Sequence, residues 1–179
     1  MVPKTMRAVV LYEHGDVDKL IYEDAYPVPA FGPLDLLVQV KAVGLNHLDV
    51  FVRRGMPGKP VHFPRITGGD IAGVVATVGT RVTGVQVGQR VLIDPAINDR
   101  RGALGEDDQG GLAEFARAPG ANAIPLPDDV SFEDAAALPI AFGTAWRMLF
   151  SRGRLRAGEH VRIGGSAGGV GSACVQIAK

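Results

Sequence analysis

Glycine and proline are the feature that most constrains the fold of this chain. The 179 residues include 24 glycines and 12 prolines, which are spread along the sequence without a repeating period. Both residue types favour turns, so they divide the chain into short apolar stretches. Short stretches bounded by turn residues predict a β-rich domain with tight connections.

Seven of these stretches are expected to be strands. In one of them, Val38 and Val40 alternate with Gln39 and Lys41, which is the pattern of a half-buried strand. The seven are Arg7–Tyr12, Leu20–Asp24, Asp35–Val43, Ile71–Val78, Arg90–Ile93, Ala113–Arg117 and Asn122–Pro125. Between the third and the fourth, Asn46–Arg54 predicts a short helix that Asn46 can cap. Many short strands with one or two helices predict a partly open barrel.

The pattern changes after Pro127. Ser131 suits the N-cap of a helix, and Asp134 stands where the acid of a capping box belongs. Pro139 is expected to end that helix, and Ile140–Ser151 predicts a second helix with an apolar stripe.

A strand-loop-helix unit is expected at the end of the chain. His160–Gly164 predicts a buried strand, a glycine-rich loop follows, and Gly169–Lys179 predicts a helix. A parallel strand needs neighbours, so we expect the chain to stop inside an α/β domain whose remainder is missing. The expected organisation is a β-rich domain over 1–127, a helical connection over 128–157, and the start of a nucleotide-binding domain over 158–179.

The glycine-rich loop is a candidate for binding a dinucleotide. Pyrophosphate is commonly bound where a strand turns into a helix, because backbone N–H groups and the helix dipole face the anion. Ser166 replaces the first glycine of the G-x-G-x-x-G spacing, and the last two are present. The residues expected to bind the cofactor here are Gly168, Gly169, Val170 and Gly171. A turn without function is the alternative, and the sequence does not separate NAD from NADP.

Composition excludes several classes of function. Nineteen Lys and Arg residues balance nineteen Asp and Glu residues, so the basic excess typical of nucleic-acid binding is missing. Cys174 is the only cysteine, which excludes an intrachain disulfide and a four-thiolate zinc site. The apolar runs are too short for a membrane span or a signal peptide. We therefore expect a soluble cytoplasmic protein with a small-molecule substrate.

Several ordered motifs together resemble the medium-chain dehydrogenase/reductase superfamily, and most of all its alcohol dehydrogenase and quinone oxidoreductase branches. The resemblance runs from Met6 to Lys179. Its motifs are MRAVVL, VQVKAVGLNHLDVFVRRG, GGDIAGVVATVG, GVQVGQRV, GGLAEFA, AAALPIAFGTAW and GGSAGGVGSACVQIAK. It implies a GroES-like catalytic barrel followed by a Rossmann cofactor domain, with the active site between them. It also implies full-length members about twice this size that form dimers.

The positions of the zinc ligands differ from those of zinc-dependent members. The family's cysteine is replaced by Asn46, its His-Glu pair by Gly69 and Asp70, and no cysteine occurs around Ala141–Gly143. The stretch Asn98–Gly102 replaces the family's cysteine lobe. Because zinc needs three such ligands, we expect no zinc and no other metal.

The resemblance also implies roles for individual side chains. Asn46 can donate an amide hydrogen to the nicotinamide ribose or to a substrate oxygen, or it can serve only as a helix cap. Asp49 either orients its neighbours or is a plain surface carboxylate. Thr144 matches a threonine beside the nicotinamide, and Asp70 is expected to have a structural hydrogen-bonding role. Leu48 replaces a hydroxyl that relays the alcohol proton in zinc enzymes.

These observations predict an NAD(P)H-dependent oxidoreductase. It would transfer hydride to a quinone, an enal-type double bond or a carbonyl, without zinc. The isolated chain is expected to have little turnover. The alternatives are alcohol dehydrogenase activity in the parent enzyme and a non-catalytic binding or structural module.

Overall fold

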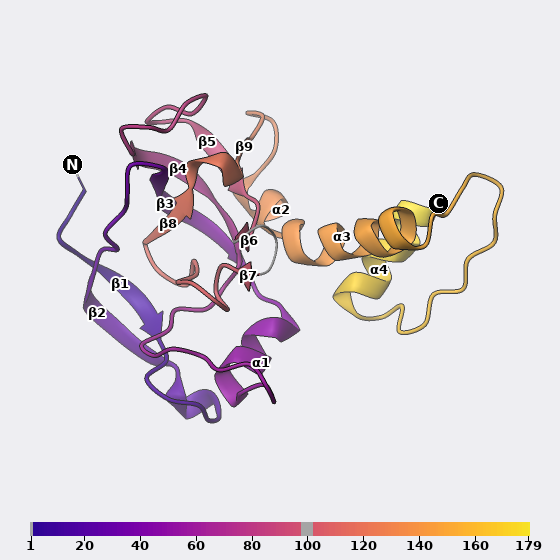
Figure 1. Ribbon diagram of the computed structural model, residues 1–179, viewed down its shortest axis with the longest axis horizontal. Helices are drawn as coiled ribbons and strands as arrows, with labels where there is room; N and C mark the ends of the chain where they lie inside the picture. Colours follow the sequence, from indigo (N-terminus) through magenta and orange to yellow (C-terminus); the bar gives the residue numbers. More distant parts are fainter. Residues whose placement is uncertain (1, 98–101) are drawn as a thin grey trace.

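The computed structural model describes residues 2–97 and 102–179. A β-rich body occupies one side of the molecule, and a pair of helices projects from it on the other (Figure 1). Most of the stretch Asn98–Gly102 lies outside the described residues. Within the described residues, no helix is long and apolar enough to cross a membrane.

The body is built on an open antiparallel sheet with the strand order β8-β3-β4-β5-β9. A two-stranded ribbon, β1-β2, lies beside it. The strands are β1 (Thr5–Val10), β2 (Ile21–Pro27), β3 (Asp35–Gly44), β4 (Asp70–Val78), β5 (Arg90–Ile93), β8 (Phe115–Pro119) and β9 (Ala123–Pro125). The seven strands predicted for the β-rich domain are present, with ends shifted by up to three residues. The two-residue strands β6 (Ala96–Ile97) and β7 (Gly102–Ala103) were not predicted, because two residues are too few to show a periodic pattern.

Strand β3 lies between two apolar cores. Leu36 and Val38 point to one face and pack with Ile71 of β4, whereas Leu37 points to the other face and packs with Val10 of β1. All of these side chains are almost fully buried. The sheet is therefore covered on both faces at its centre, which explains why β3 is more apolar than a half-buried strand.

The described residues form four α-helices: α1 (His47–Arg54), α2 (Phe132–Ala136), α3 (Pro139–Trp146) and α4 (Gly169–Ala178). The predicted cap of α2 is confirmed, because the Ser131 hydroxyl accepts the backbone N–H of Asp134 at 3.0 Å. The second predicted helix starts one residue early, at Pro139, and changes after Trp146 into a π-helical segment, η3 (Arg147–Arg152).

The strand predicted at His160–Gly164 is not present. Residues 161–163 have no regular structure, and Val161 is 43% exposed. Figure 1 shows this part of the chain as a long loop beside α3 and α4. A parallel strand forms only when neighbouring strands satisfy its backbone groups, and no described segment pairs with this one.

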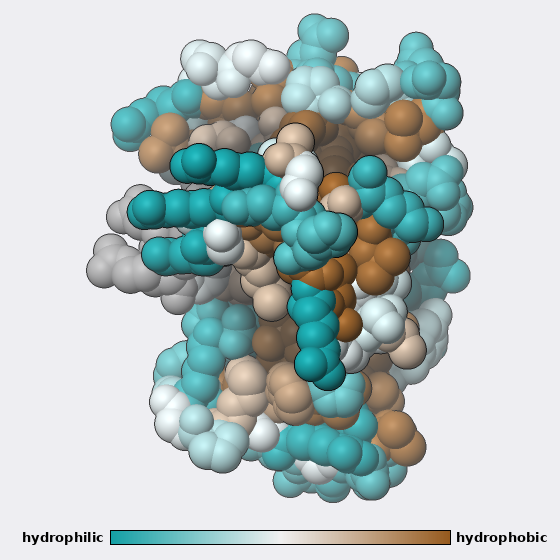
Figure 2. All heavy atoms as spheres, turned by 90° about the vertical axis from the view of Figure 1, so that its right-hand side faces the viewer, coloured by the Kyte–Doolittle hydropathy of each residue, from teal (hydrophilic) through white to brown (hydrophobic). Residues whose placement is uncertain are grey.

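Helices α3 and α4 have an apolar core of their own. Ala145 and Leu149 pack against Ala173 and Cys174, apart from the two cores of the body. Figure 2 views this end of the molecule and shows apolar atoms at its surface between long hydrophilic side chains. Trp146 and Met148 are among the exposed apolar residues of this region.

Candidate functional site

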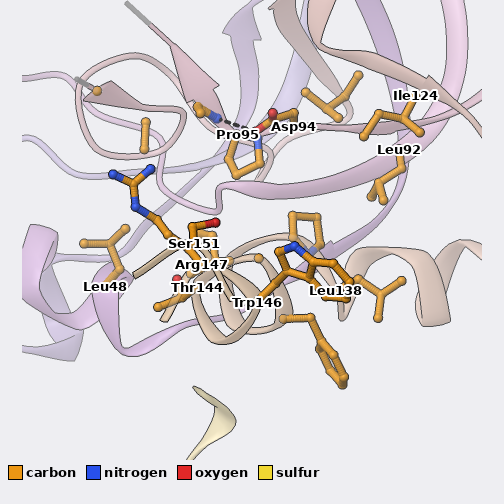
Figure 3. A pocket seen from close by; sticks show the side chains of 18 residues that line it. Leu48, Leu92, Asp94, Pro95, Ile124, Leu138, Thr144, Trp146, Arg147 and Ser151 are labelled. Carbon is orange, nitrogen blue, oxygen red and sulfur yellow. Dashed lines mark hydrogen bonds between the residues drawn. The ribbon is translucent and has the colours of Figure 1, made fainter. Parts of the chain in front are cut away.

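A pocket of about 910 Å³ lies between the β-rich body and α3 (Figure 3). Its apolar lining includes Leu48 of α1, Leu92 of β5, Ile124 of β9, and Leu138 and Trp146 at the two ends of α3. These residues come from distant parts of the sequence, so the pocket exists only because α3 lies against the open sheet. Such a lining suits a flat, largely apolar molecule.

Polar groups line the pocket on the α3–η3 segment, and Asp94, directly after β5, lines it from the body. Thr144, Arg147 and Ser151 recur at intervals of three and four residues, which places them on one face of the helix. The guanidinium group of Arg147 extends from the helix toward the body (Figure 3). A mostly apolar pocket thus has a hydroxyl and a cation where a polar end of a ligand could bind.

Asn46 and Asp70 form a hydrogen-bonded pair next to this pocket. Asn46 precedes α1, and its side-chain amide donates to Oδ2 of Asp70 at 2.8 Å. The other oxygen, Oδ1, accepts the backbone N–H of Ile140 at 2.9 Å. Asp70 is only 2% exposed, so its carboxylate connects the start of α1 to the start of α3 inside the protein.

Asp49 completes this network from within α1. Its Oδ2 accepts the backbone N–H of Asn46 at 2.7 Å, and its Oδ1 accepts that of Gly68 at 2.7 Å. The carboxylate therefore satisfies a free N–H at the helix start and holds the segment that leads into β4. Asp49 orients its neighbours and is not a plain surface carboxylate.

The buried position of Asp70 changes its acidity. Burial raises the pKa of Asp70 from 3.8 to about 6, and the negative charge of Asp49 adds to this rise. The hydrogen bonds from Asn46 and Ile140 act in the opposite direction, because they stabilise the ionised form. The carboxyl group thus titrates near neutral pH while it remains fully hydrogen-bonded.

The glycine-rich turn lies at the amino end of α4, with Gly168 as the N-cap residue. A Cβ added to Gly171 would lie 2.2 Å from the carbonyl oxygen of Gly165, so the turn can close only over a glycine at 171. The first N–H groups of a helix have no partner within it and attract anions. A Cβ at Gly169 would lie 3.7 Å from that of Ala141, which places the turn beside α3.

Comparison with known proteins identifies the family. Residues 32–128 match the alcohol dehydrogenase GroES-like domain. The chain belongs to this family. The GroES-like domain accounts for the sheet and for Asn46, Asp49 and Asp70, while the pocket also uses residues beyond it.

The relatives include quinone oxidoreductases and alcohol dehydrogenases of the medium-chain dehydrogenase/reductase superfamily. The quinone oxidoreductase of Mus musculus is 35% identical over 98% of this chain and 50% of its own length. The structure of an NAD-dependent alcohol dehydrogenase aligns with a TM-score of 0.88 and 39% identity, over 97% of this chain and 55% of that one. The structure of the CurK enoyl reductase aligns with a TM-score of 0.79 and 31% identity, over 97% of this chain and 51% of that one. The chain spans about half the length of these relatives.

The residues at the zinc-ligand positions do not fit a catalytic zinc. The Asn46 amide donates a hydrogen to Asp70, and Gly69 has no side chain to offer. Among the described residues, no three His, Cys, Asp or Glu side chains lie close enough together to hold a metal ion.

The structure brings together only some of the residues proposed from the sequence. Thr144 lines the pocket, whereas Asn46 and Asp49 are not part of its lining. The turn Gly168–Gly171 is also outside the lining, although it packs beside α3. The sequence analysis did not predict that Trp146, Arg147 and Ser151 line the pocket. The intervals of three and four residues from Thr144 to Arg147 and Ser151 could have indicated a shared helix face.

Proposed function

We propose that this chain is the substrate-binding part of a nicotinamide-dependent oxidoreductase that reduces a quinone, an enal-type double bond or a carbonyl without zinc. The observation that carries this proposal is the pocket of about 910 Å³ whose apolar wall faces Thr144 and Arg147. An apolar pocket with few polar groups suits a conjugated carbonyl compound, which has a flat apolar body and a polar oxygen at its end.

The cofactor is proposed to be NADPH or NADH. The glycine-rich turn offers the first N–H groups of α4, at Gly169, Val170 and Gly171, which suits a diphosphate, while the Gly168 N–H donates to Gly165. The Thr144 hydroxyl can bond to the nicotinamide carboxamide or ribose, since it points into the pocket beside α3. A reduced nicotinamide, when bound, supplies the hydride.

The chain's own residues would then position the acceptor and stabilise its oxygen. Leu48, Leu92 and Trp146 would form the apolar wall against which the acceptor packs. Arg147 offers a cation and Thr144 a hydroxyl toward the negative charge that develops on the oxygen during hydride transfer. Leu48 can neither donate nor accept a proton, so the oxyanion formed by hydride transfer would take its proton from solvent at the open side of the pocket.

A titration of nucleotide fluorescence tests the proposal. The 179-residue chain is mixed with NADPH or NADH, and saturable enhancement of the nicotinamide emission is expected. Gly171→Ala places a Cβ against Gly165 and should weaken binding by about tenfold or more, because a displaced turn removes N–H bonds to the diphosphate.

The control is Gln176→Ala, an exposed position on the same helix, α4, which should leave the affinity unchanged. Equal affinities for all three proteins would contradict the placement of the diphosphate. No binding by the unmodified chain would instead favour a non-catalytic module.

A further inference from the structure

Helix α3 has no cap of its own. The residue before it, Leu138, has no side-chain oxygen and makes no capping hydrogen bond, and Pro139 occupies the first helical position. The N–H of Ile140 is bonded instead to the carboxylate of Asp70, a residue 70 positions earlier in the chain. A carboxylate is a favourable partner here, because the amino end of a helix is partly positive.

The same carboxylate holds Asn46 with its second oxygen. Asp49 in turn fixes the backbone of Asn46 and of Gly68, two residues before Asp70. Both oxygens of Asp70 are therefore engaged by groups whose own positions are fixed. One buried side chain joins the residue before α1 to the first turn of α3.

The backbone around this carboxylate is closely packed. A Cβ added to Gly44 would lie 3.0 Å from the Cβ of Asp70 and 2.3 Å from the carbonyl oxygen of Ala136. A Cβ added to Gly69 would lie 2.9 Å from the side chain of Ile140. The two glycines permit the close approach that the hydrogen bonds require.

Among the described residues, the apolar core of α3 is not shared with the sheet. The buried residue of α3, Ala145, faces α4, in a core separate from those of the sheet. The short helix α2, through Ala135 and Ala136, packs on Ala72 of β4. The orientation of α3 relative to the sheet thus depends on α2 and on the Asp70 carboxylate. We call the contact of Asp70 with Asn46 and Ile140 the joint, and the pocket lies beside it.

We propose that Asp70 is a positioning residue that fixes the amino end of α3 against Asn46, and thereby sets the width of the pocket and the place of Thr144. Asp70 does not line the pocket and acts only through these two partners. The consequence for hydride transfer rests on the proposed function, whereas the joint itself can be tested without any nucleotide.

The groups facing Asp70 define how the joint responds to pH. Asp49 contributes a negative charge from α1, while the Asn46 amide and the Ile140 N–H contribute hydrogen-bond donors. Hydrogen bonds to an ionised carboxylate are stronger than those to a neutral acid. Protonation of Asp70 should therefore loosen the bond to Ile140.

Amide hydrogen exchange followed by NMR tests the proposal in the 179-residue chain. In Asp70→Ala, the protection factor of the Ile140 amide should fall by about tenfold or more, because a charge-assisted bond is lost. Protection of the Val75 amide, which is bonded to Gln89 in the sheet, should stay the same. The control Asp128→Ala removes a fully exposed carboxylate and should change neither amide.

A swapped pair separates positioning from general stabilisation. In the double variant Asn46→Asp/Asp70→Asn, residue 70 can still accept from Ile140 and can donate to the carboxylate at 46, so Ile140 protection should recover toward the unmodified level. Asp70→Asn alone places two amide side chains against each other. The protection factor of Ile140 in this variant should lie between those of the unmodified chain and of Asp70→Ala. Asp70→Asn replaces Asp70→Ala as the test variant if Asp70→Ala does not fold.

The pH profile provides an independent readout. Between pH 7 and pH 5, the protection factor of Ile140 should fall while that of Val75 does not. Unchanged Ile140 protection in the Asp70 variants would overturn the proposal. A parallel loss at Ile140 and Val75 would also overturn it, because it would show a merely structural role. Failure of nucleotide binding with these exchange results intact would count against the proposed function alone.

Discussion

At the scale of single residues, Asp70 shows how a buried carboxylate can be accommodated. A charge removed from water is costly unless hydrogen bonds replace its hydration. Asp70 receives two such bonds, from Asn46 and Ile140, yet its pKa still rises to about 6. The two bonds offset only part of the cost of burial, and the protein remains sensitive to the charge at this position.

This shift predicts a pH dependence of stability. The folded-state pKa of Asp70 is about 6, against 3.8 for its ordinary value, so the folded protein binds the proton more tightly than the unfolded chain. The stabilisation of the folded state that results from this tighter proton binding is fully present below about pH 4. It is lost as the pH rises through about 6. The free energy of unfolding should fall by at most about 3 kcal/mol over this interval.

Urea unfolding at pH 4, 5, 6 and 7 checks this prediction by comparison with Asp70→Asn. Other carboxylates, such as Asp16 and Glu114, have lowered pKa values and act in the opposite direction, so only the difference between the two proteins is informative. The free energy of unfolding of the unmodified protein, relative to that of Asp70→Asn, should fall as the pH rises from 4 to 7. Parallel curves would show that Asp70 does not titrate in this range.

Of the two roles proposed for Asn46, the structure bears only on the helix cap, and contact with a nicotinamide or a substrate stays a prediction. Asn46 stands at the N-cap position of α1, as the sequence indicated, but its side-chain amide is directed to Asp70. Its neighbour Asp49 follows the capping-box spacing, and that bond was accessible to sequence reasoning. The Asp70 contact was not, because no local pattern links positions 24 residues apart.

At the scale of elements, the contact of α2 with the sheet depends on the absence of a side chain at Gly44. Gly44→Ala would place a Cβ 2.3 Å from the carbonyl oxygen of Ala136 and force α2 away from β3. Overpacking of this kind costs about 1–3 kcal/mol. Thermal unfolding should show a lowered midpoint.

Gly143→Ala is the matched control within the same region. Gly143 lies inside α3, and a Cβ there would meet no atom within 4 Å. Replacing a helix-interior glycine with alanine should raise the stability by about 0.5–1 kcal/mol. A lowered midpoint for Gly143→Ala, or an unchanged one for Gly44→Ala, would contradict this description of the two helices.

At the scale of the whole molecule, the separation of the α3–α4 core from the cores of the body predicts unequal resistance to proteolysis. The loop between η3 and α4 contains Arg154, Arg156 and Arg162, all exposed, and its residues 161–163 have no regular structure. The buried Arg53 and Arg65 lie in the body. Trypsin cleaves mobile, exposed backbone first. The first cuts should fall in this loop and leave the β-rich body intact.

Mass spectrometry of a brief tryptic digest checks this expectation. The dominant early product should begin near the amino terminus and end at or shortly after Arg152. Early cleavage within β3 or β4 would show that the body is not the more stable part. The expected domain boundaries at 127 and 157 remain predictions, and this digest bears on the second of them.

The sequence by itself determined the seven longer strands, α1, α2 and α4, and the family. It could do so because strand alternation, helix caps and turn residues are local, with their partners within a few positions. The tertiary structure alone decided the pocket, the bond from Asp70 to Ile140 and the absence of a strand at residues 160–164. Each of these depends on which distant segments lie side by side, since a wall, a buried charge or a parallel strand is stable only with its neighbours in place.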